Sequence, residues 1–294
     1  MQNKILITTG DPNGIGAEIT IKALNKLNLD NIVLISNQKI LDFYGELNKN
    51  YEIIEIPFDE DIQPGIVTKA GGEFSFQSVK KACEIMGKAI VTAPVAKNAM
   101  HLAGYDFNGQ TEVLQKYLAH NSQLAEMLFV AGDFRVLLLT RHCALKDVCL
   151  TKELVIEKIS NLKGFFENKL NIENPKFALC GFNPHAGEDG ILGSEEVEIL
   201  KPAVDVLRAN GVDVTDPLPA DTLFVRATDY DCIIANYHDQ GLIPIKTVAG
   251  NKTVNMTIGL DVIRTSPGHG TAFDIAGKNI ADETSMIEAI KAVL

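Results

Sequence analysis

The stretch Asp231-Cys-Ile-Ile-Ala-Asn-Tyr-His-Asp-Gln-Gly241 carries the pattern that decides the fold. Its first half is an almost continuous apolar run, and Val136-Leu-Leu-Leu139 shows the same pattern. A strand with water on one face alternates apolar and polar residues, whereas a strand covered on both faces by helices is apolar throughout. Both runs therefore predict buried strands of a largely parallel sheet.

Short β-rich segments alternate with segments of helical periodicity on either side of these runs. Strands are predicted at residues 4–8, 31–36, 89–93, 127–130, 135–140, 176–180, 231–236 and 253–257. Helices are predicted at residues 18–27, 112–119, 151–170, 194–210 and 285–293, and residues 57–72 are the most loop-like. This alternation is typical of an α/β protein. No linker marks a clean boundary, so we expect a division into two domains to arise from the chain crossing back and forth.

The charge balance and the cysteines limit the class of protein. The chain has 38 acidic and 27 basic residues, a net charge of −11, whereas nucleic-acid surfaces are basic. No segment approaches the ~20 apolar residues that cross a bilayer, and the amino-terminal run lacks the features of a signal peptide. The five cysteines contain no CxxC pair and are expected to be reduced thiols. We therefore expect a cytoplasmic protein that binds neither nucleic acid nor membrane.

Three histidines follow predicted strands at the point where ligands gather in α/β sheets. His142 follows residues 135–140, His185 follows residues 176–180, and His238 follows residues 231–236. A single histidine in such a place is more often structural than a ligand. Three imidazoles with an open coordination position are a known catalytic metal arrangement, and such a metal polarises a substrate oxygen or activates water.

A second polar group lies near the carboxyl end of the chain. Lys246, Asn255 and Arg264 offer the cations and the amide that bind a carboxylate or a phosphate ester; a solvated basic face is the alternative. The opening Gly10-Asp-Pro-Asn-Gly-Ile-Gly-Ala-Glu18 follows a strand and precedes a helix, so it is either a tight turn or an anion-binding loop. It matches neither GxGxxG nor the P-loop.

Five motifs occur in order and together resemble the 4-hydroxythreonine-4-phosphate dehydrogenase family of pyridoxal phosphate biosynthesis. The first is the Gly10–Glu18 segment. The others are Asn183-Pro-His-Ala-Gly-Glu188, Leu218-Pro-Ala-Asp-Thr-Leu-Phe224, Tyr237-His-Asp-Gln-Gly241, and Ile263-Arg-Thr-Ser266 with His269-Gly-Thr-Ala272. The resemblance covers nearly the whole chain. It implies an α/β/α subunit with two subdomains around a cleft, similar to isocitrate and isopropylmalate dehydrogenases. We expect subdomain I at residues 1–100 plus 245–294 and subdomain II at residues 101–244.

The resemblance also implies site residues and cofactors. It implies one divalent metal per subunit (Zn, Mg or Co), with ligands matching His142, His185 and His238. One ligand would come from the partner subunit, which implies a homodimer with the active site at the interface. NAD or NADP would be the cofactor, bound without a GxGxxG sequence. The substrate contacts implied are Gln110, Thr111, Lys246, Asn255 and Arg264.

The activity implied is oxidation of 4-phosphooxy-L-threonine at C3, followed by decarboxylation to 3-amino-2-oxopropyl phosphate. Lys246 is the candidate for proton transfer, although a purely anion-binding Lys246 fits equally. This sequence has Gln110 where the family pattern has His, and residues 44–80 are short for the family. A neutral amide cannot become a cation, so a dehydrogenase of threonate or erythronate 4-phosphate is an alternative. Alternatives from other classes are a three-histidine metal hydrolase and an acyl-phosphate transferase.

Overall fold

The computed structural model describes residues 1, 3–107, 109–119 and 125–294. Contacts divide the chain into two compact units, Met1–Ala125 with Val254–Leu294, and Glu126–Thr253. The chain passes from the first unit to the second after Ala125, whereas we expected this boundary near residue 100. Helices α4 (Lys97–Leu102) and α5 (Gln110–Leu118) pack against α3 (Lys69–Ile85), which keeps them in the first unit.

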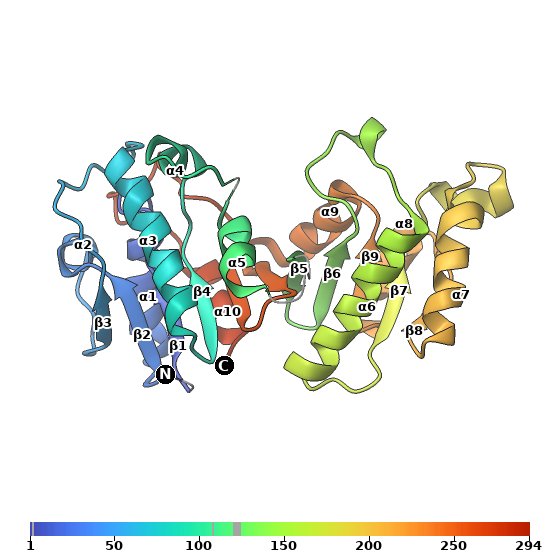
Figure 1. The fold of residues 1–294 in the computed structure, drawn as a ribbon, viewed down its shortest axis with the longest axis horizontal. Coiled ribbons are helices and arrows are strands. Elements are labelled where there is room, and N and C mark those ends of the chain that lie inside the picture. The colour runs from blue at the N-terminus through green and yellow to red at the C-terminus, as the bar shows by residue number, and fades with distance from the viewer. Residues whose placement is uncertain (2, 108, 120–124) are drawn as a thin grey trace. The chain divides into compact units, whose positions relative to one another are not determined.

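The strands of the first unit have the order β3-β2-β1-β4-β11-β10. Strands β3, β2, β1 and β4 are parallel, β11 is parallel to β4, and β10 is antiparallel to β11. Their bounds are β1 Ile5–Thr8, β2 Ile32–Ser36, β3 Glu52–Glu55, β4 Ala89–Thr92, β10 Val254–Ile258 and β11 Ile263–Pro267. The remaining helices of this unit are α1 Gly16–Leu27, α2 Gln38–Tyr44 and α10 Thr284–Lys291 (Figure 1).

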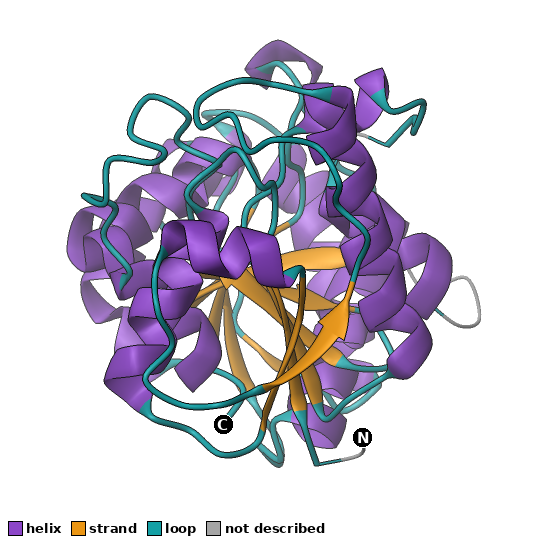
Figure 2. Cartoon of the chain, turned by 90° about the vertical axis from the view of Figure 1, so that its left-hand side faces the viewer, coloured by secondary structure: helices purple, strands orange, loops and turns teal. Residues whose placement is uncertain are grey.

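Side chains of this sheet alternate between two apolar cores, because successive residues of a strand point to opposite faces. Ile5 and Ile7 belong to a core that includes residues of α1 and α10. Leu6 and Ile90 belong to a second core, with Phe74 of α3. Figure 2 shows the strands in orange between layers of helices. The predicted α/β/α architecture is confirmed for this unit.

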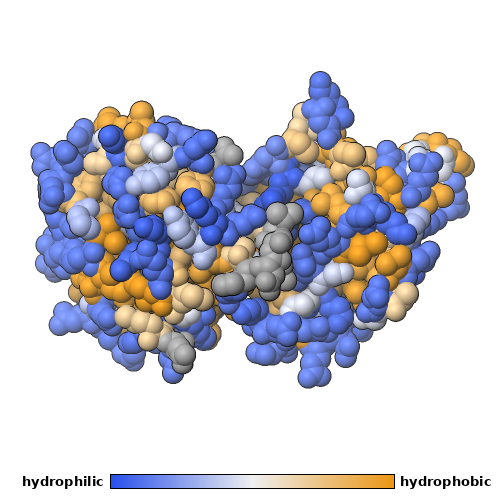
Figure 3. Space-filling model, viewed as in Figure 1, coloured by the Kyte–Doolittle hydropathy of each residue, from blue (hydrophilic) through white to orange (hydrophobic). Residues whose placement is uncertain are grey.

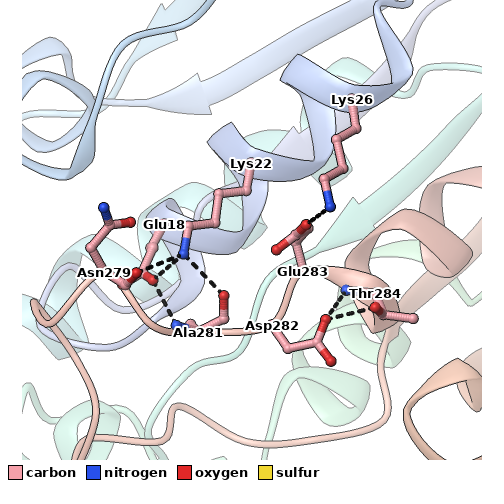
Figure 4. A network of polar contacts seen from close by, with 8 residues as sticks. All are labelled: Glu18, Lys22, Lys26, Asn279, Ala281, Asp282, Glu283 and Thr284. Atoms are coloured by element: carbon pink, nitrogen blue, oxygen red, sulfur yellow. Dashed lines mark hydrogen bonds and ion pairs between the residues drawn. The ribbon is translucent and has the colours of Figure 1, made fainter.

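Ion pairs and hydrogen bonds attach the carboxyl-terminal segment to α1 (Figure 4). The buried Glu18 carboxylate accepts hydrogen bonds from Lys22 Nζ and from the Ala281 amide, each at 2.8 Å. Lys22 Nζ also donates to the Ala281 carbonyl oxygen, and Lys26 pairs with Glu283. These contacts hold the segment that leads into α10 against the amino-terminal helix.

The strands of the second unit have the order β5-β6-β9-β7-β8. Strands β5 and β6 are antiparallel, and β6, β9, β7 and β8 are parallel. Their bounds are β5 Glu126–Ala131, β6 Phe134–Leu138, β7 Lys176–Leu179, β8 Asp213–Val214 and β9 Cys232–Ala235. The helices are α6 Lys152–Lys169, α7 Lys201–Ala209, α8 Ala220–Leu223 and α9 His238–Ala249. The 3₁₀ segments are η1 Leu145–Asp147, η2 Pro184–Gly190, η4 Phe224–Asp229 and η5 Gly250–Lys252, and η3 Glu196–Leu200 is a π-helix.

The apolar runs that predicted buried strands form the neighbouring strands β6 and β9 of the second unit. Val136 of β6 and Ile233 of β9 pair in register and pack with Leu242 and Ile245 of α9. On α6, the Phe166 ring meets the Phe177 ring of β7 at a centroid distance of 5.5 Å. The visible surface of both units is largely hydrophilic, with hydrophobic patches between charged side chains (Figure 3).

No helix among the described residues is both long enough and apolar enough to traverse a lipid bilayer. The five cysteines are all free thiols. Burial raises the pKa of Cys83 to about 12, so this thiol is neutral. It therefore packs as a small apolar side chain.

Candidate active site

Two of the three predicted metal ligands, His142 and His238, lie together in the second unit. His142 follows β6, and His238 is the first residue of α9, directly after β9. Because β6 and β9 are parallel neighbours, their carboxyl ends reach the same edge of the sheet. Thr140 joins the two loops, since its amide and its hydroxyl both donate to the Asn236 carbonyl oxygen. The two imidazole centroids are 5.7 Å apart.

A pocket of about 280 Å³ surrounds these two imidazoles. Its lining consists of residues from the two loops and from the start of α9: Arg141, His142, Cys143, Leu145, Val148, Tyr237, His238 and Asp239. The pocket therefore combines imidazole nitrogens, one guanidinium and one carboxylate with an apolar side. This combination suits a ligand of a few polar atoms near a metal ion.

A carboxylate orients the His238 ring. Asp239 Oδ1 lies 2.7 Å from His238 Nδ1. An ionised carboxylate only accepts hydrogen bonds, so Nδ1 carries the proton and the lone pair of Nε2 stays available to a ligand. Metal-bound histidines commonly have such a second partner, which fixes the tautomer and the direction of the ring. The sequence interpretation missed this role of Asp239, although its place beside His238 was the signal.

His185 lies in a strained turn. Residues 185–189 of η2 have φ between +43° and +78°, a left-handed conformation that costs non-glycine residues roughly 1–2 kcal/mol each. Asn183 anchors the start of the turn by donating to the carboxylates of Glu195 and of the buried Glu196. The exposed His185 ring contacts Glu188, with Nδ1 2.9 Å from Oε1. Strain of this kind is found where a side chain must be presented to a ligand.

The structure brings together His142 and His238 but does not place His185 in a group with them. Within the described part of the chain, no three His, Cys, Asp or Glu side chains lie close enough to hold a metal ion. The donors nevertheless fit a divalent metal, because His185 and His238 each have Nδ1 next to a carboxylate. Lys246 lies on the exposed side of α9 and does not line the pocket.

Arg264 of the first unit is a buried cation with neutral neighbours. Its side chain donates to two threonine hydroxyls, with Nε and Nη2 at 3.1 and 2.6 Å from Thr92 Oγ1 and Nη1 at 3.0 Å from Thr257 Oγ1. Across the described residues, no carboxylate forms an ion pair with it. Burial lowers the pKa of the Arg264 guanidinium to about 10, so it remains a cation at neutral pH. A buried charge with no countercharge is costly, and an anionic ligand removes that cost.

The other polar side chains predicted in this unit lie on β10 and α5. Arg264 pairs with Thr257 across β10 and β11, and Asn255 is two residues away on the same face. Gln110 starts α5, and its Nε2 donates to the carbonyl oxygen of Ala93, the residue after β4. Asn255 Oδ1 and Gln110 Oε1 are buried acceptors without a hydrogen-bond partner in the described structure. Thr111 follows Gln110 in the first turn of α5.

Close packing explains the glycines of the Gly10–Glu18 segment. Gly10 has φ +75°, and a Cβ there would lie 2.2 Å from the Pro94 carbonyl oxygen. A Cβ on Gly16 would lie 2.2 Å from the Thr9 carbonyl oxygen. Asp11, buried in the same loop, accepts a hydrogen bond from the Asn13 amide, and burial raises the pKa of its carboxyl to about 6. These contacts are compatible with a tight turn and leave the anion-binding interpretation open.

Comparisons with known proteins identify the family of this chain. The family model for the pyridoxal phosphate biosynthetic protein PdxA matches residues 2–293. The 4-hydroxythreonine-4-phosphate dehydrogenase of a Sulfurihydrogenibium species is 41% identical, over 99% of this chain and 97% of that protein. The D-threonate 4-phosphate dehydrogenase of Cupriavidus necator is 38% identical, over 97% of this chain and 94% of that protein.

Solved structures share the fold. The 4-hydroxythreonine-4-phosphate dehydrogenase of Klebsiella pneumoniae superimposes with a TM-score of 0.89 at 33% identity, covering 99% of this chain and 98% of that one. The isocitrate dehydrogenase of Methylococcus capsulatus superimposes with a TM-score of 0.50 at 14% identity, covering 100% of this chain and 85% of that one. At that identity the likeness concerns the fold alone, and it agrees with the fold class predicted from the sequence.

Proposed function

Because the chain belongs to the PdxA family, we propose that it is an NAD(P)-dependent 4-hydroxythreonine-4-phosphate dehydrogenase. The substrate is 4-phosphooxy-L-threonine, which is oxidised at C3. The resulting β-keto acid loses its carboxylate as carbon dioxide, and the carbon that it leaves takes up a proton. The product is 3-amino-2-oxopropyl phosphate.

The buried Arg264 is the observation that carries this proposal. Two neutral hydroxyls hold the guanidinium and leave its charge uncompensated. A guanidinium binds phosphate and carboxylate oxygens through paired N–H donors. Asn255 and Gln110 add amide groups from neighbouring elements of the same unit. These groups therefore bind and orient the phosphorylated substrate.

We propose that His142, His185 and His238 hold one divalent ion (Zn, Mg or Co). Such an ion stabilises the alkoxide form of a substrate hydroxyl and thereby lowers the cost of removing its proton. His142 and His238 are already neighbours in one chain. A ligand from the partner subunit of a homodimer would complete the pair that the described residues of one chain bring together.

Lys246 is the proposed acceptor for the C3 hydroxyl proton, with anion binding as its alternative role. It lies on α9, the helix that starts with His238. Lys246→Arg separates the two roles, because arginine keeps the cation and does not release a proton near neutral pH. A fall in kcat with an unchanged KM identifies proton transfer. Retention of kcat identifies anion binding.

The same scaffold supports a second candidate, oxidation of threonate 4-phosphate or erythronate 4-phosphate. Gln110 favours this candidate because its amide is neutral, and one N–H of its Nε2 donates to the Ala93 carbonyl oxygen. The buried Oε1, which has no partner among the described residues, is a group that can meet the substituent that differs between the amino acid and the hydroxy acid. An oxygen acceptor can bind either an ammonium group or a hydroxyl group. The Cupriavidus necator protein that is similar to this chain is named D-threonate 4-phosphate dehydrogenase.

We further propose a cytoplasmic enzyme. The support is the set of five free cysteines, which a reducing compartment preserves. The negative net charge of −11 also favours an enzyme for a small metabolite rather than a nucleic-acid-binding protein.

The test is nicotinamide reduction by the purified protein with 4-phosphooxy-L-threonine, and separately with D-threonate 4-phosphate and D-erythronate 4-phosphate. Each reaction is run with NAD and with NADP, before and after chelator, and after metal is added back. The proposal expects chelator-sensitive reduction with the amino acid preferred. Preference for a hydroxy acid selects the second candidate. Absence of turnover with all three compounds contradicts both.

A further inference from the structure

Thr92 and Arg264 make an unusual contact for a buried arginine. Two of the guanidinium nitrogens, Nε and Nη2, point at the single Thr92 hydroxyl oxygen. The third, Nη1, points at Thr257 Oγ1. All three side chains are buried. The guanidinium is therefore fixed along one edge by Thr92 and at one end by Thr257.

Strand register explains how the three side chains meet. Arg264 of β11 pairs with Ile90 of β4 on one side and with Thr257 of β10 on the other. Thr92 is two residues beyond Ile90, so its side chain points to the same face of the sheet. Arg264 thus lies between two threonines from neighbouring strands, and both contacts come from the rigid centre of the sheet rather than from a loop.

The hydroxyls orient the cation without cancelling its charge. A carboxylate in either position would neutralise the guanidinium and compete with an anionic ligand. The nearby Cys83 does not neutralise it either, because burial keeps that thiol protonated. The guanidinium also retains N–H groups beyond the three bonds to the hydroxyls.

We propose that Thr92 and Thr257 are positioning residues that hold the Arg264 guanidinium in the direction required to bind the substrate phosphate. This inference rests on the proposed function for the identity of the substrate. The contact between the threonines and Arg264, and its effect on anion binding, can be tested without any turnover.

The test compares Thr92→Val, which removes the hydroxyl at nearly constant volume, with Thr92→Ser, which keeps it. Thr265→Val is the matched control. Thr265 lies on β11 beside Arg264 and is equally buried, but its hydroxyl donates to the Ala289 carbonyl oxygen of α10. Both valine variants lose one buried hydroxyl, so their losses of stability should be similar. Of the two, Thr92→Val is the variant that changes the surroundings of Arg264.

Two readouts are taken, the Michaelis constants for 4-phosphooxy-L-threonine and the dependence of Tm on inorganic phosphate. We expect Thr92→Val to raise KM and the half-saturating phosphate concentration by roughly 10- to 100-fold, as for a lost bond to a charged group. The kcat at saturating substrate should change little. Thr92→Ser should restore both values, and Thr265→Val should resemble the unmodified protein. Thr257→Val should act in the same direction with a smaller effect, because it removes one bond rather than two.

Equal effects of Thr92→Val and Thr265→Val on phosphate binding overturn the inference, and so does failure of Thr92→Ser to restore binding. Absence of phosphate protection in the unmodified protein also overturns it. A third result separates the inference from the proposed function. If the protein shows no turnover, but phosphate still raises its Tm and Thr92→Val still weakens that effect, the proposed function is wrong and the inference is supported.

Discussion

The imidazole rings of His142 and His238 lie side by side at a centroid distance of 5.7 Å, although the two residues follow different strands, β6 and β9. Their proximity results from the parallel pairing of β6 and β9, which ends both strands at one edge. Asp239 then fixes the direction of the His238 ring. The histidine pair is therefore built on buried strands and is expected to be largely preformed before a metal binds.

Replacing His238 with Ala should abolish metal binding and lower kcat/KM by at least about 100-fold. Asp239→Asn should retain some metal but weaken its affinity by about 10- to 100-fold, because an amide orients the ring less firmly than a carboxylate. His101→Ala is the control, since His101 is an exposed residue of α4 in the other unit. Metal content and titration with Co²⁺ measure the effect. Equal metal content in all three variants would contradict the assignment.

Replacing Gly187 with Ala should disrupt the turn that presents His185. Gly187 has φ +78°, and its Cβ would lie 2.6 Å from Glu196 Oε2, the carboxylate that anchors Asn183. Gly190→Ala is the matched control, because Gly190 has φ +95° but open space around its Cβ position. Both variants pay the strain of a positive φ, roughly 1–2 kcal/mol. We expect only Gly187→Ala to lose metal affinity in addition, so equal metal affinities would argue against this role of the turn.

Replacing Lys158 with Met should strongly destabilise the second unit. Lys158 Nζ lies 2.9 Å from Glu126 Oε1, and Glu126 is only 1% exposed. Without this partner, the cation that remains beside the buried carboxylate among the described residues is Arg141, at 3.7 Å. Breaking a buried pair in this way costs about 3–5 kcal/mol. Lys163→Met, which removes a half-buried i,i+4 pair with Glu167 from the same helix, should cost no more than about 0.5 kcal/mol. Denaturant unfolding distinguishes them, and similar losses would show that the Glu126 contact is unimportant.

Asp11 should make the stability of the fold depend on pH. Burial raises the pKa of its carboxyl from 3.8 to about 6, so the folded state binds this proton more tightly than the unfolded chain does. The stabilisation is complete below about pH 4 and is lost as the pH rises through about 6. Asp11→Asn cannot ionise, so its stability relative to the unmodified protein should increase by as much as about 3 kcal/mol between pH 4 and pH 8. Unfolding at the two pH values measures this change, and a constant difference would contradict the raised pKa of Asp11.

The strands with continuous apolar runs could be predicted from the sequence, whereas α3 and α9 are among the helices that were not predicted. Helix α3 contains Gly71 and Gly72 near its start, a pair that favours a loop locally. Gly72 instead permits a close approach to α4, since a Cβ there would lie 1.9 Å from the Ala99 carbonyl oxygen. Helix α9 contains Gly241 and Pro244, and its packing on β6 outweighs their low helix propensity.

Part of the site could be predicted because ligands gather at strand ends. This rule identified His142 and His238, which the structure brings together. The left-handed turn around His185 could not be predicted, because Ala186 and Glu188 are not residues that favour this conformation. The contact between Thr92 and Arg264 depends on strand register, which a single sequence specifies poorly.

The most direct test of the central claim is the ratio of kcat/KM for 4-phosphooxy-L-threonine to kcat/KM for unphosphorylated 4-hydroxy-L-threonine. It is measured in the unmodified protein and in Arg264→Met, which removes the cation from the buried site. We expect a large preference for the phosphorylated compound that collapses toward unity in the variant, with folding checked by circular dichroism. An unchanged preference in a folded Arg264→Met protein would contradict the assignment of Arg264 to the substrate phosphate.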